Sequence, residues 1–356
     1  MAQLNCLIVA LLFLSCSSTK PPSSPSEGLD ILFRDYNRAR DPGAAVLVVK
    51  DGKTLQKKSY GLANLEEHRP VSSSTNFRLA SITKQFTAMC ILMLAEKNEL
   101  SLDDKILRFF PRLPDTTREI RVRHLLNHTS GLIDYEPLIP DSQTTQVLDS
   151  NVLTLLEKAD SVYFPAGSKF QYSNSGYVLL SLIIESVSHQ SFADFLKQNI
   201  FTRLGMANTV ARQEGISTVV NRAYGYTQTD SGFVFTDQSV TSATLGDGGI
   251  YSSVDDLFQW DQALYTDKLV QRQTLDLAFT PSVKTDTTAF YGFGWFVDEY
   301  RGMKCLYHTG TSRGFRNAII RIPGQSFSVI ILTNRNEGDP LDVARRIIDL
   351  YFPDEG

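Results

Sequence analysis

Ser81 and Lys84 are the first pair of side chains whose types and spacing could do chemistry. They form an S-x-x-K tetrapeptide at the start of an apolar stretch, residues 82–97, that has helical periodicity. Residues three apart share one face of a helix, so the lysine amine can reach the serine hydroxyl. A serine hydroxyl becomes a good nucleophile when a nearby base takes its proton. The pair therefore predicts nucleophilic catalysis, but residues 17–20 match the same tetrapeptide pattern, so further segments must support it.

Two later segments supply that support. In residues 164–177, Tyr172 and Asn174 stand two apart just before a predicted helix. Residues 305–311 are a predicted strand that carries a run of four candidate substrate-binding residues, His308, Thr309, Gly310 and Thr311. Taken singly, these could be a buried aromatic residue, a helix cap, a core histidine and a strand end. Their occurrence together favours a catalytic site.

Together, these motifs resemble the three motifs of the serine β-lactamase and penicillin-binding-protein superfamily, in its class C β-lactamase, DD-carboxypeptidase and esterase branch. The order of the motifs and their long separations agree with that family, as do further segments at 126–132, 204–206, 246–249, 255–257 and 332–334. The resemblance covers roughly residues 29–352. It implies a β-lactamase/transpeptidase-like fold, mixed α/β with an all-α part, in which helices flank an antiparallel sheet.

The resemblance also implies roles for the residues. Ser81 would be the acylated nucleophile, Lys84 and Tyr172 would share the proton relay, and Asn174 would orient Lys84 and the substrate amide. Lysine and tyrosine are both protonated at neutral pH, so the site must favour proton loss from one of them, and either could be the base.

The backbone N–H groups of Ser81 and Thr311 would form the oxyanion hole, with Thr309 and Gly310 on the substrate-binding strand. Gly310 would let this strand approach the substrate closely. His128 is interpreted as structural, and the glycine run 246–249 as a loop near the cleft that supplies positive-φ positions. We expect no cofactor and no metal ion.

The identity of His308 bears on the substrate. True β-lactamases of this branch usually have lysine there, whereas the His-Thr-Gly version resembles DD-carboxypeptidases, D-aminopeptidases and esterases. Because imidazole loses its charge near pH ~6.5, affinity for a substrate carboxylate should fall between pH ~6 and 8 unless Arg313 or Arg316 holds that group. We expect a serine hydrolase that acts through an acyl-enzyme on a D-amino-acid peptide or a small ester. The alternatives are a β-lactamase and a non-catalytic penicillin-binding sensor.

The elements that must position these residues come from both ends of the chain. Residues 44–61 form a predicted hairpin around Asp51 and Gly52. Further strands are predicted at 292–297, 305–308, 318–322 and 326–332, and a closing helix at 341–352. The middle, approximately residues 98–280, reads as an inserted helical lobe with helices at 177–187 and 192–204. Residues 29–356 should therefore form one hydrolase domain whose sheet joins both chain ends.

Charge and motif content exclude several classes. The chain has 35 Lys and Arg against 39 Asp and Glu, a net charge of −4, so it lacks the basic surface that nucleic acid requires. It also lacks the H-E-x-x-H, C-x-x-C and P-loop patterns. The expected partner is a small-molecule or peptide substrate, not a nucleic acid.

The first residues indicate export. Residues 1–15 resemble a signal peptide whose apolar run is too short to span a bilayer, and residues 13–16 resemble a bacterial lipobox ending at Cys16. We expect a membrane-anchored lipoprotein facing the periplasm, lipidated at Cys16 and tethered by the Ser/Pro-rich residues 16–28. The alternative is an ordinary cleaved signal that yields a soluble periplasmic or secreted protein. Cys90 and Cys305 are predicted core residues, between which a disulfide is possible in an oxidising compartment.

Overall fold

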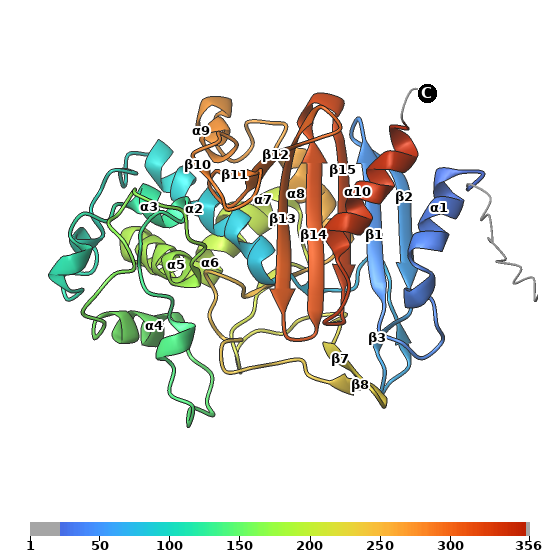
Figure 1. The fold of residues 1–356 in the computed structure, drawn as a ribbon, viewed down its shortest axis with the longest axis horizontal. Coiled ribbons are helices and arrows are strands. Elements are labelled where there is room, and N and C mark those ends of the chain that lie inside the picture. The colour runs from blue at the N-terminus through green and yellow to red at the C-terminus, as the bar shows by residue number, and fades with distance from the viewer. Residues whose placement is uncertain (1–21, 354–356) are drawn as a thin grey trace, which may run out of the picture.

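The largest sheet of the described structure is antiparallel and has eight strands. It extends from the middle of the molecule to its right-hand side in Figure 1. The computed structural model describes residues 22–353. In spatial order the strands are β10 (Val283–Lys284), β11 (Phe290–Tyr291), β12 (Phe296–Tyr300), β13 (Met303–Ser312), β14 (Phe315–Ile322), β15 (Phe327–Thr333), β1 (Ala44–Lys50) and β2 (Lys53–Tyr60). The expected antiparallel sheet flanked by helices is confirmed.

The alternating side chains of β1 explain why it lies inside the sheet. Ala45, Leu47 and Val49 pack into one apolar cluster, while Ala44, Val46 and Val48 pack into a second cluster on the opposite face. A β-branched strand that is apolar on both faces is stable only where both faces are covered. The predicted hairpin is confirmed, because Asp51 and Gly52 take φ values of 51° and 71°, as a tight two-residue turn requires.

The two chain ends meet in this sheet. β1 pairs with β15 in an antiparallel register from Ala44 opposite Thr333 to Lys50 opposite Phe327. Helices α1 (Pro25–Leu32) and α10 (Pro340–Tyr351) contact each other and cover one face (Figure 1). The predicted end of the tether is wrong: Ser24 caps α1, so residues 25–28 are already helical. The folded part therefore begins four residues before Leu29.

The opposite face of the sheet is covered by α2 (Thr83–Glu96), which follows the 3₁₀ turn η2 (Ala80–Ile82), and by α8 (Val254–Ala263). Twelve of the fourteen residues of α2 are buried, so the prediction of a buried helix here is confirmed. Such a helix is held by packing on every side. This gives the residues at its start a fixed position.

The predicted helical lobe at 98–280 is only partly helical. It contains α3 (Val122–Leu126), α4 (Asp149–Leu156), α5 (Asn174–Ser188), α6 (Phe192–Leu196), the π-helical turn η6 (Lys197–Phe201), α7 (Thr202–Leu204) and α9 (Arg272–Ala278). It also contributes β6 (Val210–Ala211) and β9 (Ile250–Ser252), which join β5 (Phe77–Arg78), and the hairpin of β7 (Tyr226–Thr229) and β8 (Gly232–Phe235). A further pair, β3 (Leu62–Asn64) and β4 (Arg69–Pro70), lies earlier in the sequence, between β2 and β5. Helix α8 lies within the sequence range of the predicted lobe, but it packs on β1 and β15. It is therefore part of the layer that covers the large sheet.

One predicted strand is displaced. Residues 292–295 form a turn between β11 and β12 instead of the start of a strand. Gly294 has φ 76°, and a Cβ there would lie 2.7 Å from the carbonyl oxygen of Lys84. The glycine lets this turn pack against the backbone of α2.

The two core cysteines lie on opposite faces of the sheet. Cys90 on α2 belongs to one apolar cluster and Cys305 on β13 to the other, and both are free thiols. Cys90 and Cys305 therefore form no disulfide with each other. Burial raises the pKa of both thiols, that of Cys305 to about 12, which makes them poor nucleophiles.

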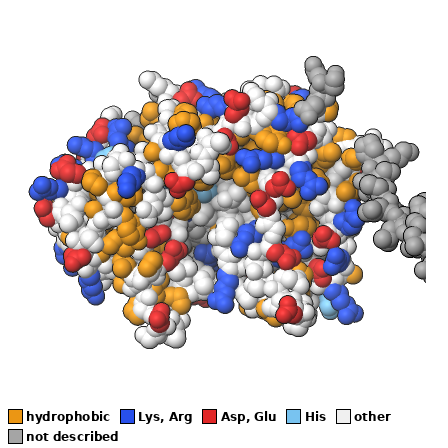
Figure 2. Space-filling view, in the orientation of Figure 1, with side chains coloured by type: hydrophobic (Ala, Val, Ile, Leu, Met, Phe, Trp, Pro, Cys, Tyr) orange, Lys and Arg blue, Asp and Glu red, His pale blue; other side chains and the backbone are white. Residues whose placement is uncertain are grey.

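Cys16 and the predicted signal peptide lie outside the described residues. Within residues 22–353, no helix combines the length and apolar character needed to cross a bilayer. Acidic and basic side chains are interspersed over the visible face (Figure 2). This mixture agrees with the small net charge of −4.

The two-sided burial of β1 makes a stability prediction. Leu47 is 1% exposed and Leu55 on the neighbouring β2 is 40% exposed. Leu47→Ala should lower the free energy of unfolding by about 2–5 kcal/mol, because it leaves a cavity in the core. The control Leu55→Ala should change it by about 0.5 kcal/mol or less. Denaturant unfolding of both variants measures this difference. Equal losses of unfolding free energy in the two variants would contradict the burial of Leu47 in the core.

Candidate active site

The amine of Lys84 is the centre of the candidate site. The Lys84 side chain is fully buried, and its Nζ lies 3.2 Å from Ser81 Oγ, 2.8 Å from Asn174 Oδ1 and 2.9 Å from the carbonyl oxygen of Asp247. A buried amine requires such partners, because an unpaired one is costly to remove from water. The three acceptors come from η2, the start of α5 and the loop before β9. The structure thus brings together Ser81, Lys84 and Asn174, as predicted.

Ser81 lies in the middle of η2, directly before α2, and its hydroxyl caps neither element. The residue before it, Ala80, has φ 50°, a left-handed conformation that costs about 1–2 kcal/mol for an L-residue. The preceding backbone is held on both sides: Leu79 N–H donates to Ile250 O at 2.8 Å, and Asn317 Nδ2 donates to Arg78 O at 2.8 Å. These bonds keep the strained turn in place.

Gly310 has a different role from the one predicted. A Cβ at this position would lie 2.0 Å from the carbonyl oxygen of Leu79. The glycine therefore lets β13 approach the turn that carries Ser81, rather than the substrate. Gly310 and Thr309 do not line the cleft, whereas Thr311 does.

The start of α5 positions Asn174. Ser173 caps the helix by accepting from Gly176 N–H, and Asp134 Oδ1 accepts from the N–H groups of Asn174 and Ser175, each at 3.1 Å. A carboxylate at a helix N-terminus is favourable because of the helix dipole. The Asn174 amide is thereby fixed, with its oxygen on Lys84 and its nitrogen donating to Glu136 at 3.0 Å.

Tyr172 lies beside this group. Lys84 Nζ is 4.9 Å from the centre of the Tyr172 ring, and the ring packs on His128 with 4.3 Å between centroids. The Tyr172 hydroxyl is buried and has no hydrogen-bond partner among the described residues. Tyr172 is not among the residues that line the cleft. A buried hydroxyl without a partner is uncommon in protein interiors, which keeps Tyr172 a candidate member of the proton relay. His128 Nδ1 accepts from Ser173 N–H at 3.1 Å, so His128 supports the turn before α5.

The structure contradicts the role expected for His308 at the substrate carboxylate. Its side chain is 1% exposed, its Nδ1 donates to Thr309 O at 2.6 Å, and its Nε2 accepts from the Tyr291 hydroxyl at 3.1 Å. Both ring nitrogens are therefore occupied in a neutral imidazole. Burial and the nearby Lys84 charge lower the pKa of His308 from 6.5 to about 3. His308 supplies no cation between pH 6 and 8.

The glycine run 246–249 lies beside the cleft, as predicted, because Asp247 and Gly248 line it. The predicted positive-φ positions are wrong, since none of its glycines has a positive φ. A Cβ at Gly246 would instead lie 2.3 Å from the carbonyl oxygen of Tyr177, so the loop needs glycine to pack on α5. Asp149, which is half-buried, accepts from the N–H groups of Leu245 and Gly246, and loss of water around it raises its pKa to about 6. Together these contacts place the Asp247 carbonyl on Lys84.

A polar cleft of about 190 Å³ opens onto Ser81. Its walls come from the turn of Ser81, the start of α5, β13 and the loop 239–248. They include Arg78, Ala80, Tyr135, Glu136, Asn174, Ser239, Thr241, Ser242, Thr244, Asp247, Gly248, Thr311, Ser312 and Arg313. Pairing of β12 with β13 ends at Phe296 opposite Tyr307, so in the described structure β13 continues past the end of β12 beside this cleft. Arg313 is available to a substrate carboxylate, whereas Arg316 Nη1 donates to the backbone of Ser312 and Phe315.

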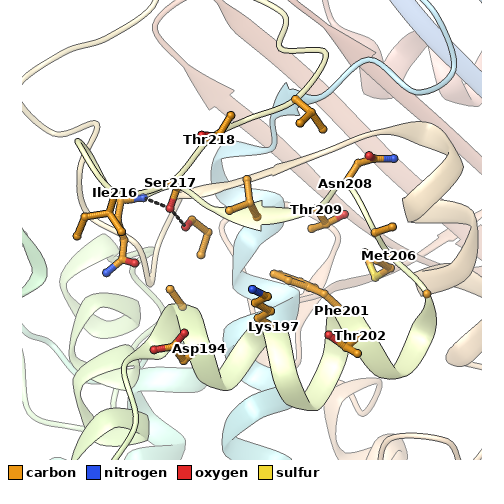
Figure 3. Close-up of a pocket in the computed structure, with 17 residues that line it drawn as sticks. Asp194, Lys197, Phe201, Thr202, Met206, Asn208, Thr209, Ile216, Ser217 and Thr218 are labelled. Atoms are coloured by element: carbon orange, nitrogen blue, oxygen red, sulfur yellow. Dashed lines mark hydrogen bonds between the residues drawn. The ribbon is translucent and has the colours of Figure 1, made fainter.

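A larger cavity of about 650 Å³ lies elsewhere, beside α6, η6 and β6 (Figure 3). Its Ser217 hydroxyl is bonded to the backbone at Gln213 N and Ala211 O. Among the residues that line it, no lysine nitrogen is hydrogen-bonded to a serine hydroxyl. The smaller cleft at Ser81 is therefore the candidate active site.

Sequence reasoning missed several residues of the cleft, among them Glu136, Asp247, Arg78 and the hydroxyl-bearing residues of the loop 239–244. Asp247 lies inside the glycine run 246–249, for which the sequence predicts only a role in shaping a loop. An aspartate within a glycine run near the cleft was the signal that could have identified it as a cleft residue. Arg78 and Glu136 carried none, because only the tertiary structure brings them beside Ser81.

The contact at Gly310 predicts a coupled loss. Gly310→Ala should destabilise the protein by about 1–3 kcal/mol and lower its hydrolytic rate, because the added methyl group must displace β13 or the turn of Ser81. Gly324→Ala is the matched control, since no atom lies within 4 Å of the added Cβ there. Thermal unfolding and turnover measured on both variants test this, and full activity in Gly310→Ala would contradict it.

The environment of His308 predicts its titration. The folded imidazole titrates near 3 and the unfolded one near 6.5, so the unfolded chain binds more protons between these values. His308 therefore contributes stability above pH ~6.5 that is lost as the pH falls toward 3. Its ring resonances in an NMR titration, assigned with His308→Gln, should stay constant from pH 6 to 8. A midpoint near 6.5 would show that the ring is accessible to protons.

Comparisons with known proteins show the family of this chain. The Beta-lactamase family model matches residues 29–351. Penicillin-binding protein 4* of Bacillus subtilis is 34% identical over 326 residues, which cover 87% of this chain and 72% of that protein. Protein flp of Staphylococcus aureus is 29% identical over 86% of this chain, but the match spans only 62% of flp.

Solved structures show the same fold. The octameric penicillin-binding protein homologue from Pyrococcus abyssi has a TM-score of 0.82 and 26% identity, covering 92% of this chain and 76% of its own. The D-amino acid amidase from Ochrobactrum anthropi SV3 has a TM-score of 0.80 and 22% identity, covering 93% and 99%. With the family match over most of the chain and the Ser81–Lys84 contact in its cleft, this protein belongs to the β-lactamase and penicillin-binding-protein superfamily of serine hydrolases.

Proposed function

We propose that this protein hydrolyses D-amino-acid peptides or amides, or small esters, through an acyl-enzyme on Ser81. The observation that carries this proposal is the buried Lys84 Nζ, 3.2 Å from the Ser81 hydroxyl in an open polar cleft. The fold it shares with a D-amino acid amidase and with EstCE1, described as a hydrolase with promiscuous acyltransferase activity, supports this range of substrates.

In the acylation step, Ser81 Oγ attacks the substrate carbonyl carbon while its proton leaves toward the relay of Lys84 and Tyr172. Lys84 is the member of the relay in contact with Oγ. The partnerless Tyr172 hydroxyl is the second group available to carry a proton to the leaving amine or alcohol. Asn174 holds the Lys84 nitrogen in place at 2.8 Å. Water then releases the acyl group from Ser81.

The tetrahedral intermediate requires donors for its oxyanion. The backbone N–H groups of Ser81 and Thr311 take this role in the proposal, because both residues line the cleft. Ser81 lies at the start of a helix, where the dipole favours negative charge. Arg313 takes the place first expected for His308, since a guanidinium stays charged throughout the working pH range.

The location also remains part of the proposal. Export and lipid anchoring at Cys16 rest on the sequence of residues 1–16. An exported hydrolase would meet D-amino-acid peptides outside the cytoplasm.

Replacement of the nucleophile tests the reaction. Ser81→Ala should lower hydrolysis of D-aminoacyl amides, D-Ala-D-Ala peptides and short esters by about 10³-fold or more. Ser17→Ala, at the other S-x-x-K match, is the control and should keep wild-type rates. Hydrolysis that survives Ser81→Ala would show that another residue is the nucleophile.

A fluorescent penicillin distinguishes the members of this class on the same protein. A long-lived label on Ser81, located by mass spectrometry, is expected of a peptidase or penicillin-binding protein. Rapid release of hydrolysed penicillin would instead identify a β-lactamase. Ester turnover without any label would identify an esterase.

A further inference from the structure

The carboxylate of Asp247 is buried in the cleft, and only one of its two oxygens has a hydrogen-bond partner in the described structure. Its side chain is 6% exposed, and Oδ2 accepts from the Tyr135 hydroxyl at 3.1 Å. Oδ1 is buried and has no hydrogen-bond partner among the described residues. A buried carboxylate oxygen without a donor is unfavourable, so this position suits a ligand that brings an N–H donor.

A second carboxylate, that of Glu136, lines the same cleft. The pKa of the Glu136 carboxyl is raised, mainly because this group has lost part of its contact with water. The negative charges of Asp134 and Asp247 raise it further. The Asp134 carboxylate is committed to the start of α5, where it accepts from two backbone N–H groups. The Glu136 and Asp247 carboxylates therefore share this wall as crowded negative charges, which a cation would relieve.

The cations already present do not pair with these two carboxylates. The Lys84 amine is directed at Ser81, Asn174 and the backbone carbonyl of Asp247. Arg78 Nη1 donates to Ser242 O, on another part of the wall. Within residues 22–353, no salt bridge joins Arg78 or Arg313 to Glu136 or Asp247. A ligand cation would therefore not have to displace a salt bridge from Glu136 or Asp247.

Asp247 lines the same small cleft as Ser81, which limits where a cation bound to its carboxylate can lie. The backbone carbonyl of Asp247 also contacts Lys84 Nζ, which contacts the Ser81 hydroxyl that attacks the substrate. In an aminoacyl substrate, the α-ammonium is attached to the carbon next to the attacked carbonyl. An α-ammonium therefore lies near Ser81 in the productive complex, whereas the ammonium of a long side chain can lie farther away.

We propose that Asp247 and Glu136 bind the free α-ammonium group of the substrate. This inference rests on the proposed function and narrows it: the enzyme acts at a free amino terminus, on aminoacyl amides, aminoacyl esters or short peptides. It discriminates against N-acylated substrates, because their amide nitrogen is uncharged and carries only one N–H donor.

Three substrates matched around the amine test the proposal. They are D-alanine p-nitroanilide, N-acetyl-D-alanine p-nitroanilide, and propionyl p-nitroanilide, which lacks the amine. The wild-type kcat/KM should be about 10- to 100-fold higher for D-alanine p-nitroanilide than for the other two, as expected for a charge-assisted hydrogen bond. This preference should shrink above pH ~8, where an α-amino group loses its proton.

Variants locate the binding group. Asp247→Asn and Glu136→Gln should each reduce the preference for the free amine by about 10-fold, mainly through KM. Asp230→Asn is the matched control, because it removes the same charge from an exposed residue in the turn between β7 and β8, and it should leave the preference unchanged.

Several results would overturn the inference. Equal wild-type kcat/KM values for the three anilides would do so, as would a preference for the N-acetylated one. If Asp247→Asn lowered kcat/KM for all three by the same factor, the carboxylate would have only a structural role. The wild-type comparison and its pH dependence stand even if a variant fails to fold. Absence of all turnover together with an unlabelled Ser81 would overturn the proposed function and this inference together.

Discussion

The burial of one lysine amine is the constraint on which the rest of the site depends. Lys84 lies on a helix that is enclosed by apolar residues, so its nitrogen cannot be solvated by bulk water. Protein acceptors must take the place of water, and Ser81, Asn174 and the Asp247 carbonyl do so within 3.2 Å. Each acceptor belongs to a different segment. The arrangement therefore exists only when the sheet, the start of α5 and the loop 239–248 are all in place.

Close approaches of backbone to backbone provide much of this positioning. Gly294, Gly310 and Gly246 each stand where a Cβ would lie within 2.7 Å of a carbonyl oxygen, on Lys84, Leu79 and Tyr177 respectively. These glycines let the turn after β11, strand β13 and the loop 246–249 pack directly against the elements that carry the reactive groups. The left-handed Ala80 next to Ser81 shows that the surrounding contacts can hold a strained backbone.

The cleft is lined by side chains of both charges. Arg78 and Arg313 provide fixed positive charge, and Glu136 and Asp247 provide negative charge. Three of the residues that line the cleft have a buried side-chain polar atom without a partner in the described structure: Arg78 Nε, Asp247 Oδ1 and Ser312 Oγ. Unused hydrogen-bonding groups are uncommon in protein interiors, and their concentration here is what a ligand site requires. His308, buried and neutral behind Tyr172, contributes packing and hydrogen bonds to this division, but no charge.

Much of the fold could be predicted from the sequence, because strong local patterns of apolar residues determine it. The apolar alternation of residues 44–50, the Asp51–Gly52 turn and the unbroken apolar helix after Ser81 are determined by nearest neighbours in the sequence. Local patterns failed where tertiary contacts decide conformation. Residues 25–28 are helical because Leu29 packs on the sheet, and residues 292–295 form a turn because Gly294 must fit against α2.

The sequence by itself determined the reactive pair, its partners Tyr172 and Asn174, and the membership of both chain ends in one sheet. Their types and order carry that information directly. Only the tertiary structure decided which groups are charged, exposed and unpaired. It buries His308 in the core, and it packs Gly310 against the Leu79 carbonyl instead of the substrate. It also brings Glu136 and Asp247, 111 residues apart in the sequence, into the same cleft. The physical reason is that burial, desolvation and the fit of one backbone on another depend on the whole surroundings of a residue, which no local pattern contains.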